Sequence, residues 1–204
     1  MARRKPNKIK PDDFATRRKE LMSLMEANSI AIMPGALAHV RNSDVEFRFR
    51  QNSDFHYLAG FDEPDAVLAL IPGREHGEAI LFCRESDDDH EHWHGMTTGP
   101  EAVIKLYGMD DAFPIADIDD ILPGLIEGRS RIYYPMGDEP DFDVRVIDWV
   151  QMISTSVQPG TEPPGEFIQL EQYLHELRLC KSAAEIDMIR RAVNATSQGY
   201  LRIL

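Results

Sequence analysis

The spacing of apolar residues changes several times in the first quarter of the chain, and each spacing predicts a different element. Over residues 11–28 apolar positions recur at helical intervals behind a proline and two aspartates, which predicts a helix with acidic residues at the positive end of its dipole. Residues 29–33 read as a strand that Pro34 stops, and residues 35–45 as a polar connection. In residues 46–50 aromatic and charged side chains alternate, which predicts an extended segment with one aromatic face.

A capped helical turn and a hairpin are predicted next. Ser53 or Asp54 can accept hydrogen bonds from the free amides of a short helix, and Gly60 can end it because glycine tolerates positive φ. Residues 66–71 form a continuous apolar run, which suits a central strand covered on both faces. Residues 79–82 follow a glycine-containing turn, so we expect them to pair back on that strand and make the sheet mixed.

Helices and strands continue to alternate in the second half of the chain. Residues 99–108 predict a helix with proline in its first turn and glycine at its end. Residues 117–122 look helical and are expected to be interrupted at Pro123, residues 131–134 read as a strand, and residues 142–153 space a further helix. The predicted fold class is therefore α/β, with a mixed central β-sheet flanked by helices.

The composition changes toward the carboxyl end. Residues 155–165 hold three prolines and two glycines, a linker-like composition, and residues 170–179 are expected to be helical or partly extended. Ser182 and Glu185 then have the spacing of a capping box. Apolar residues keep helical spacing from there to Leu204, so we expect a helix cut off in mid-pattern and a second domain that this chain largely lacks.

The charge balance argues against several classes of partner. The 204 residues carry 22 basic and 35 acidic side chains, a net charge of −13. The first ten residues contribute five of the positive charges and no acid, so the remainder carries −18 (−13 minus 5). A surface this acidic repels nucleic acid and anionic membrane, and we expect neither as a partner.

Neither a membrane helix nor a disulfide framework is expected. The longest purely aliphatic run is only six residues long, at 66–71, which is too short to cross a bilayer. Cys83 and Cys180 are far apart in sequence and form no paired motif, which favours reduced thiols. We therefore expect a cytoplasmic protein.

Three histidines and a glutamate within residues 90–94 are the sharpest candidate for a metal site. On an extended segment His90, His92 and His94 would share a face, but the usual pattern of paired ligands from two elements is absent, so a solvated acidic loop is favoured. The chain also contains no nucleophile elbow, phosphate-binding loop, dinucleotide-binding glycine motif or H-E-x-x-H motif.

A second group of charged residues surrounds the central stretch. Asp44 with Arg41 and Arg50 could form a charge pair at a domain boundary or shape the substrate end of a cleft, and an ordinary loop ion pair is the favoured alternative because exposed pairs add little stability. We interpret Asp54 as a helix cap and His56 as a packed or hydrogen-bonded ring, since the sequence places no carboxylate beside it.

The same central stretch also carries a family resemblance. The run RQNSDF at residues 50–55 and the run GFDEPDAVL at residues 60–68 resemble the amino-terminal domain of bacterial Xaa-Pro aminopeptidase, also called aminopeptidase P, of the creatinase/prolidase superfamily. The likeness extends from Phe14 through Trp93 to residues 174–182 in the same order and spacing.

The resemblance implies a fold and a division into domains. The fold would be the creatinase/aminopeptidase P amino-terminal domain, with a ribonuclease H-like motif, followed by the first helix of a truncated pita-bread domain. Residues 1–10 would be a basic tail and residues 11–170 the amino-terminal domain. Residues 171–204 would be a linker and the start of the catalytic metallopeptidase domain.

The resemblance also implies a function for the full-length protein. Proteins like these remove the amino-terminal residue from peptides with proline in second position, using two metal ions, usually Mn²⁺, and many are homo-oligomers, as dimers or tetramers. The metal ligands would lie downstream of Leu204. We therefore expect no catalytic residue and no metal ligand in this chain, which alone would be inactive and would shape the cleft and the oligomer contacts.

One residue and two other functions stay open at this point. Trp93 aligns with a family tryptophan that reaches toward the active-site entrance of a neighbouring subunit, and the alternative is an aromatic that anchors its own loop. The function could instead be that of a prolidase or creatinase-like hydrolase. It could also be that of a nonenzymatic protein-binding module of the same fold, for which the acidic surface would suit basic partners.

Overall fold

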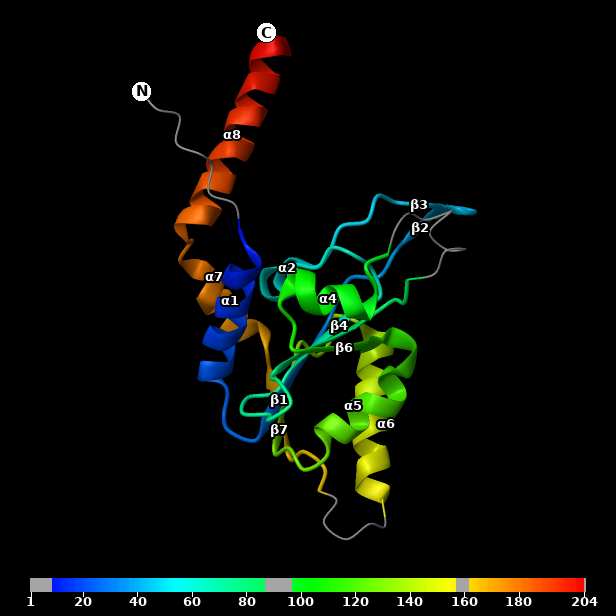
Figure 1. Ribbon diagram of the computed structural model, residues 1–204. Coiled ribbons are helices and arrows are strands. Elements are labelled where there is room, and N and C mark those ends of the chain that lie inside the picture. Colours follow the sequence, from blue (N-terminus) through cyan, green and yellow to red (C-terminus); the bar gives the residue numbers. More distant parts are fainter. Residues whose placement is uncertain (1–8, 87–96, 157–161, 204) are drawn as a thin grey trace.

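The computed structural model describes residues 9–86, 97–156 and 162–203 and shows a six-stranded mixed sheet with helices on both faces (Figure 1). The strand order is β6-β5-β4-β1-β7-β8. The strands of this sheet are β1 (Ser29–Pro34), β4 (Val67–Leu70), β5 (Ala79–Cys83), β6 (Asp111–Pro114), β7 (Arg131–Tyr134) and β8 (Glu166–Gln169). The main helices are α1 (Pro11–Leu24), α2 (Ser53–Ala59), α4 (Gly99–Tyr107), α5 (Ile118–Ile126), α6 (Pro140–Thr155), α7 (Glu171–Leu179) and α8 (Ala183–Ile203).

The centre of the sheet follows the prediction. Strand β1 pairs antiparallel with β4, where Ala31 lies opposite Leu70, and parallel with β7 on its other side. Strands β4 and β5 form the expected antiparallel hairpin, with Val67 opposite Phe82. Both β1 and β4 are buried along their whole length, as continuous apolar runs require. The mixed central sheet of the predicted α/β fold is thus confirmed.

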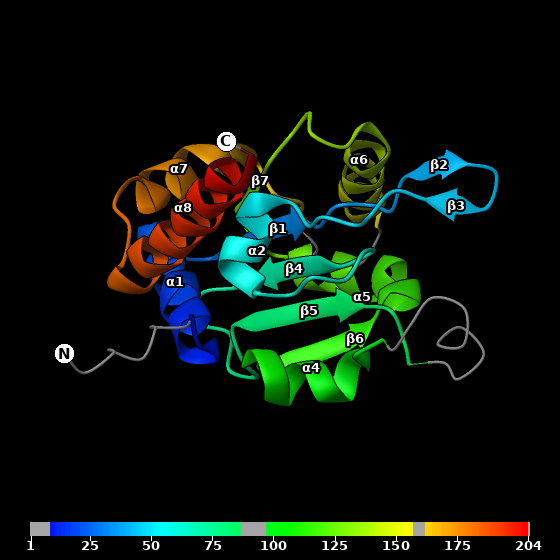
Figure 2. The same cartoon turned by 90° about the horizontal axis from the view of Figure 1, so that it is seen from above.

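Two hydrophobic cores lie on the two faces of the sheet. One is formed by α1, α2, α4 and α7, which contribute among others Leu21, Phe55 and Leu174. The other is formed by α5 and α6, from which Leu122 and Trp149 pack on the opposite face. Figure 2 shows the sheet between these two groups of helices. Because side chains of a strand point alternately to opposite faces, a single apolar strand such as β4 contributes side chains to both cores.

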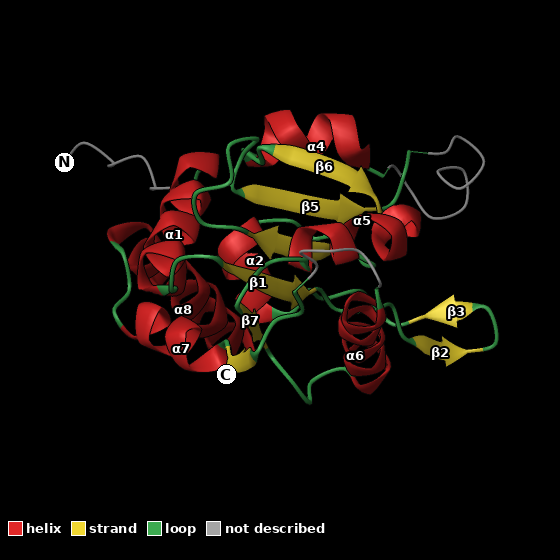
Figure 3. Ribbon diagram, turned by 90° about the horizontal axis from the view of Figure 1, so that it is seen from below, coloured by secondary structure: helices red, strands yellow, loops and turns green. Residues whose placement is uncertain are grey.

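Both edges of the sheet and one hairpin were missed. The edge strands β6 and β8 pair parallel with β5 and β7, yet the sequence gives no strand prediction for either. Within the predicted polar connection, β2 (Val40–Asn42) and β3 (Val45–Glu46) form a separate two-stranded hairpin that projects from the body (Figures 2 and 3). Its strands are exposed throughout. Of the two aromatic residues that follow it, Phe47 is 58% exposed, whereas Phe49 is partly buried and lines a hollow.

Two local predictions are wrong. The cap of α2 is Asn52, whose side-chain oxygen accepts hydrogen bonds from the backbone amides of Asp54 and Phe55; neither Ser53 nor Asp54 takes this role. Helix α5 is not interrupted at Pro123 but continues to Ile126, because Leu122 and Ile126 on either side of the proline both pack in the core. The expected glycine stop of α2 is confirmed, with Gly60 at φ 68°.

The carboxyl-terminal helices differ in how they pack. Helix α7 buries Leu174 in the first core. Helix α8 starts with the predicted capping box, in which the Ser182 amide donates to Glu185 Oε2 at 2.7 Å and the Glu185 amide donates to Ser182 Oγ at 3.3 Å. From there α8 projects away from the sheet (Figure 1), and no helix within the described ranges has the length and apolarity needed to cross a membrane.

Candidate functional site

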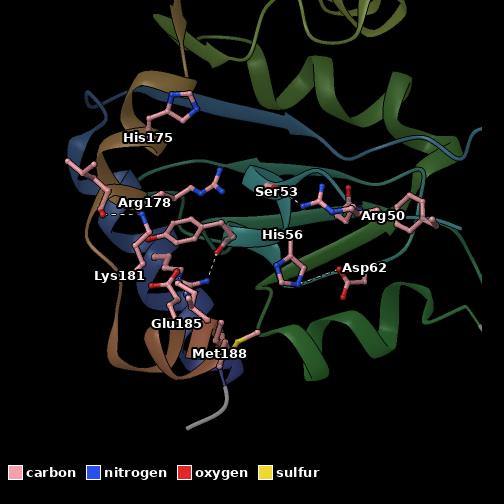
Figure 4. Close-up of a pocket in the computed structure, with 16 residues that line it drawn as sticks. Arg50, Ser53, His56, Asp62, His175, Arg178, Lys181, Glu185 and Met188 are labelled. Carbon is pink, nitrogen blue, oxygen red and sulfur yellow. Dashed lines mark hydrogen bonds and ion pairs between the residues drawn. The ribbon is translucent and has the colours of Figure 1, made fainter. Parts of the chain in front are cut away.

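A hollow of about 850 Å³ opens where α1, α2, α7 and the first turns of α8 meet (Figure 4). Half of its lining residues are charged or histidine, and α8 adds two apolar side chains, Met188 and Ile189, at one side. The charged and histidine residues of the lining are Arg17, Arg50, His56, Asp62, His175, Arg178, Lys181 and Glu185. These residues come from parts of the sequence more than a hundred positions apart, so only the fold brings them together.

Arg17 on α1 lies at the junction of three elements. Its Nη1 donates to the backbone carbonyl of Tyr57 at 3.1 Å, and its Nη2 lies 3.1 Å from Glu185 Oε1 on α8. The guanidinium carbon is 4.2 Å from the centroid of the Tyr57 ring and 5.2 Å from that of Phe14. The Arg17 side chain is only 8% exposed, so its charge is removed from water but compensated by a carboxylate, a carbonyl and two aromatic faces.

Arg18, the next residue, faces the interior between α1 and α4. Its Nη1 donates to the Leu58 carbonyl at 3.0 Å, and its Nη2 donates to the carbonyls of Tyr107 and Gly108. These carbonyls stand at the ends of α2 and α4, where no intrahelical amide is left to satisfy them. Burial lowers the pKa of Arg18 to about 10, with Asp110 acting in the opposite direction.

Helix α7 is tied to α2 on the other side of the hollow. Arg178 Nη1 forms an ion pair with Asp54 Oδ1, and His175 Nε2 lies 3.8 Å from Asp54 Oδ2. The Tyr57 hydroxyl donates to the Leu177 carbonyl at 3.4 Å. Burial raises the pKa of Tyr57, with Arg17 acting to lower it and Glu185 to raise it. Tyr57 therefore stays a neutral donor at physiological pH.

His56 has the carboxylate partner that the local sequence does not place. Its Nε2 lies 3.4 Å from Asp62 Oδ1, and its ring packs edge-on against Phe14 at 5.8 Å between centroids. The prediction of a packed or hydrogen-bonded ring agrees with this geometry. Asp62 is 73% exposed, so water screens the pair and it adds little stability.

The sequence-based candidates fall into three places. Arg41 and Asp44 lie on the exposed β2–β3 hairpin, where the Arg41 guanidinium is 5.9 Å from the Phe47 ring centroid. Arg50 lines the hollow, and its Nη2 donates to Ser53 Oγ at 3.1 Å. Asp44 makes no ion pair with Arg41 or Arg50, all three of which the structure describes. Trp93 and the histidine-rich segment 90–94 lie outside the described residues.

Gln51 is a buried polar residue whose role the sequence analysis missed. It is 5% exposed, and its side-chain oxygen accepts from the amides of Ala36, at 2.6 Å, and Asn52, at 2.8 Å. Its side-chain nitrogen donates to the Glu63 carbonyl at 2.9 Å. The one side-chain amide of Gln51 therefore connects three segments: the chain entering the hairpin, the cap of α2 and the loop after α2. The sequence signal for this role was a polar run between two buried strands, because polar groups buried there must find hydrogen-bond partners within the protein.

Glu63 and Asp65 hold the two stretches of chain that flank residues 87–96. The Glu63 carboxylate accepts hydrogen bonds from the amide and hydroxyl of Thr98. Asp65 pairs with Arg84, whose Nε lies 2.8 Å from Asp65 Oδ2. Both acids belong to the sequence GFDEPDAVL that carries the family resemblance, so part of that motif serves to fix these flanks.

The charged side chains of the hollow already have partners within the protein: Arg17 pairs with Glu185, His56 with Asp62 and Arg178 with Asp54, while Arg50 and Lys181 donate to a serine hydroxyl and to backbone carbonyls. No group of three or more histidine, cysteine, aspartate or glutamate side chains suited to a metal ion occurs in the ranges the structure covers. Buried side-chain nitrogen and oxygen atoms in those ranges all have hydrogen-bond partners. The arrangement can therefore bind, orient and connect chain segments, and a Mn²⁺ pair does not fit the described residues.

Comparisons with known proteins agree with one another. Residues 14–133 match the family model described as "Aminopeptidase P, N-terminal domain". The chain is 33% identical over 199 residues to the Xaa-Pro aminopeptidase of Escherichia coli, a match that covers 97% of this chain and 45% of that protein. It superposes on Pseudomonas aeruginosa aminopeptidase PepP with a TM-score of 0.94 and 53% identity, covering 96% of this chain and 44% of that one.

A further structural match is the Escherichia coli aminopeptidase P in complex with substrate. Its TM-score is 0.91 at 33% identity, covering 95% of this chain and 44% of that one. The chain thus spans about half the length of the relatives it matches. The shared part includes both the sheet domain and most of the two carboxyl-terminal helices.

Proposed function

The chain belongs to the family of aminopeptidase P N-terminal domains, and on that basis we propose that the full-length protein is a metal-dependent Xaa-Pro aminopeptidase. The observation that carries the proposal is the superposition of nearly the whole chain on an aminopeptidase that is also more than half identical in sequence. Fold alone would not assign an activity, but fold, family and sequence identity together support one.

The proposed reaction is removal of the amino-terminal residue from peptides whose second residue is proline. An Xaa-Pro bond lacks the amide hydrogen that most peptidases bind, so its hydrolysis needs a dedicated enzyme. We propose that two Mn²⁺ ions bind to residues outside this chain; the described residues hold no group of ligands suited to a metal ion. When bound, such a pair would polarise the scissile carbonyl. The 204-residue chain itself would be inactive.

For this domain we propose a role in shaping the cleft and the subunit contacts. The β2–β3 hairpin, with Arg41 and Asp44, projects from the body and exposes apolar side chains beside the charges. Val40 and Val45 are 65% and 55% exposed. Exposed apolar groups next to charged ones are typical of contact surfaces. We propose that this hairpin, Arg50 and Trp93 face the substrate cleft or a neighbouring subunit of a homo-oligomer.

We also propose a cytoplasmic location and no nucleic-acid or membrane partner. The net charge of −13 supports this, since it disfavours binding to anionic polymers and lipid surfaces. Cys83 and Cys180 are both free thiols, which suits a reducing compartment.

The test is an assay of the purified full-length protein. With Mn²⁺ we expect release of the first residue from Xaa-Pro-Xaa tripeptides, loss of that activity with a chelator, and at least tenfold lower kcat/KM when alanine replaces the second-position proline. Hydrolysis confined to Xaa-Pro dipeptides would indicate a prolidase instead. No turnover of any of these peptides, with metal bound, would support the nonenzymatic alternative.

A further inference from the structure

Helix α8 meets the described part of the domain at its first turns and then projects away from it (Figure 1). None of its side chains in the described range is buried, and its apolar residues Ile189 and Val193 are 50% and 57% exposed. Helix packing usually comes from an apolar stripe buried between neighbours, and here no side chain of that stripe is buried within the described range. With no buried apolar side chain on the described residues of α8, the polar contacts at its start are the main candidates for setting its direction.

Arg17 provides the contact that joins α8 to the sheet domain. Its Nη2 reaches Glu185 in the first turn of α8, while its Nη1 is fixed on the Tyr57 carbonyl at the middle of α2. Glu185 is itself fixed by the capping box with Ser182. In Figure 4 Glu185 lies beside Met188, on the side of the hollow that α8 forms. A chain of rigid contacts thus runs from α2 through one guanidinium to the first turn of α8.

The chemistry of the guanidinium explains why arginine stands here. Its planar fork can donate to two acceptors in different directions and stack on an aromatic face at the same time. At position 17 it does all of these, because the Tyr57 ring lies 4.2 Å below it. A lysine could keep the charge but would lack the stacking plane and the fixed angle between donors.

We propose that Arg17 is a positioning residue that sets the direction of α8 relative to the sheet domain. Through α8 it sets the position of the charged hollow and of the β2–β3 hairpin relative to the catalytic part of the full-length enzyme. This second consequence rests on the proposed function. Arg17 itself touches neither substrate nor metal in this role.

The first test measures α8 directly and needs no activity. In the 204-residue chain with Cys180→Ser, spin labels at Lys105→Cys on α4 and Gln198→Cys on α8 report the distance between the two helices. Lys105 and Gln198 are both exposed, and the remaining Cys83 is buried. We expect a single narrow distance distribution, which Arg17→Ala broadens at least about twofold. Glu185→Gln should broaden the distribution too, because it removes the charge that pairs with Arg17. The amide oxygen of the glutamine can still accept from the Ser182 amide, so the start of α8 is kept.

A matched control comes from Arg145, which pairs with Asp119 at 2.9 Å and lies over the rings of Phe142 and Trp149, far from α8. Arg145→Ala removes the same kinds of contact and should leave the distribution unchanged. Equal widths for the parent, Arg17→Ala and Glu185→Gln would overturn the proposal. Should Arg17→Ala not fold, Glu185→Gln alone decides, because it leaves Arg17 on the Tyr57 carbonyl and ring.

The second test uses the full-length enzyme. Arg17→Ala should lower kcat/KM for an Xaa-Pro-Xaa peptide about tenfold with unchanged Mn²⁺ affinity, and Arg17→Lys should recover part of the loss. Unchanged kcat/KM in Arg17→Ala would reject the role in positioning the catalytic part. If the parent enzyme does not hydrolyse these peptides, the proposed function fails, whereas the distance measurement still decides the direction of α8.

Discussion

Asp54 on α2 and Arg178 on α7 are 124 positions apart in the chain and form an ion pair at the wall of the hollow. Asp54 is free to do so because Asn52 caps α2 in its place. The Asp54 side chain is 13% exposed and that of Arg178 36%, so the pair is partly shielded from water. Together with the hydrogen bond from Tyr57 to Leu177, it attaches α7 to the domain.

We expect Asp54→Asn to lower the free energy of unfolding by about 1–2 kcal/mol, because a half-buried Arg178 loses its charged partner. Urea unfolding monitored by circular dichroism measures this. The control is Asp187→Asn on α8, whose partner Arg190 is 73% exposed. It should change stability by less than about 0.5 kcal/mol. Equal effects for the two variants would show that burial does not strengthen the Asp54 pair.

The stability of the chain should fall at alkaline pH because of Cys83. Burial raises the pKa of this thiol from 9.0 to about 12, with Glu63 adding to the shift. Between these values the unfolded chain has lost the proton that the folded chain keeps, so the stabilising contribution is complete below pH 9 and disappears as the pH rises toward 12. Through this group alone, the free energy of unfolding should fall by up to about 1.4 kcal/mol per pH unit in that range.

The measurement is urea unfolding at pH 8, 9 and 10 for the parent and for Cys83→Ala. At pH 8 the variant should have a lower free energy of unfolding than the parent, because it lacks the buried thiol side chain. Between pH 9 and 10 its free energy of unfolding should fall less than that of the parent, because it lacks the titrating group. Tyr57, Tyr107 and Tyr133 also have raised pKa values through burial, and they add a further decrease above pH 10 in both proteins. Parallel pH curves for the two proteins would contradict the assignment to Cys83.

Gly60 should be the most sensitive glycine of the α2 region. It has φ 68°, and a Cβ there would lie 2.6 Å from the Phe14 ring. Gly60→Ala should therefore cost about 2–4 kcal/mol, the sum of left-handed backbone strain and overpacking. Gly73, at φ 75° with nothing within 4 Å of its Cβ position, is the matched control and should cost only about 1 kcal/mol on replacement by alanine. Thermal unfolding of both variants compares these costs.

The sequence predicted the centre of the sheet and failed at its edges for a physical reason. Strand β4 is buried on both faces and therefore shows as a continuous apolar run. Strand β6 is only half-buried and begins with Asp111 and ends with Pro114, so its composition resembles a loop. Strand β8 is half-exposed as well. At both edges the parallel partner strand, which the local sequence does not reveal, determines the extended conformation.

The candidate site was predicted less well than the fold, because its contacts are long-range. In the sequence Arg17 and Arg18 look like part of a solvated helix face. Both are buried, because their guanidinium groups donate hydrogen bonds to backbone carbonyls of α2 and, for Arg18, also of α4. The partners Glu185 and Arg178 follow the sheet domain in sequence, and only the return of α7 beside α1 brings them to the hollow.

Gln51 should tolerate substitution poorly despite its polar character. Gln51→Leu would leave the amides of Ala36 and Asn52 and the carbonyl of Glu63 without their partner, and we expect a loss of about 3 kcal/mol. Gln51→Glu can still accept from both amides but, when ionised, cannot donate to the Glu63 carbonyl. The free energy of unfolding of Gln51→Glu should therefore lie closer to that of the parent at pH 5 than at pH 7, because protonation of the new carboxylate restores a donor. A deficit independent of pH would reject this explanation.

The hairpin residues Arg41 and Asp44 should affect activity without affecting stability. Both are exposed, and neither takes part in an ion pair among the described residues, so Arg41→Ala and Asp44→Ala should change the unfolding free energy of the 204-residue chain by less than about 0.5 kcal/mol. In the full-length enzyme each should lower kcat/KM for an Xaa-Pro-Xaa peptide by about tenfold if the hairpin faces the cleft or a neighbouring subunit.

Arg48→Ala, which removes an equally exposed charge just beyond the hairpin, is the control for these two variants and should stay within about twofold of the parent. Sedimentation of the same proteins separates the two possible reasons for lost activity. A variant that remains assembled but turns over slowly places its residue at the cleft, whereas one that dissociates places it between subunits. Full activity in both Arg41→Ala and Asp44→Ala would remove the hairpin from the proposed site, because an exposed arm that contributes neither stability nor turnover has no part in the reaction.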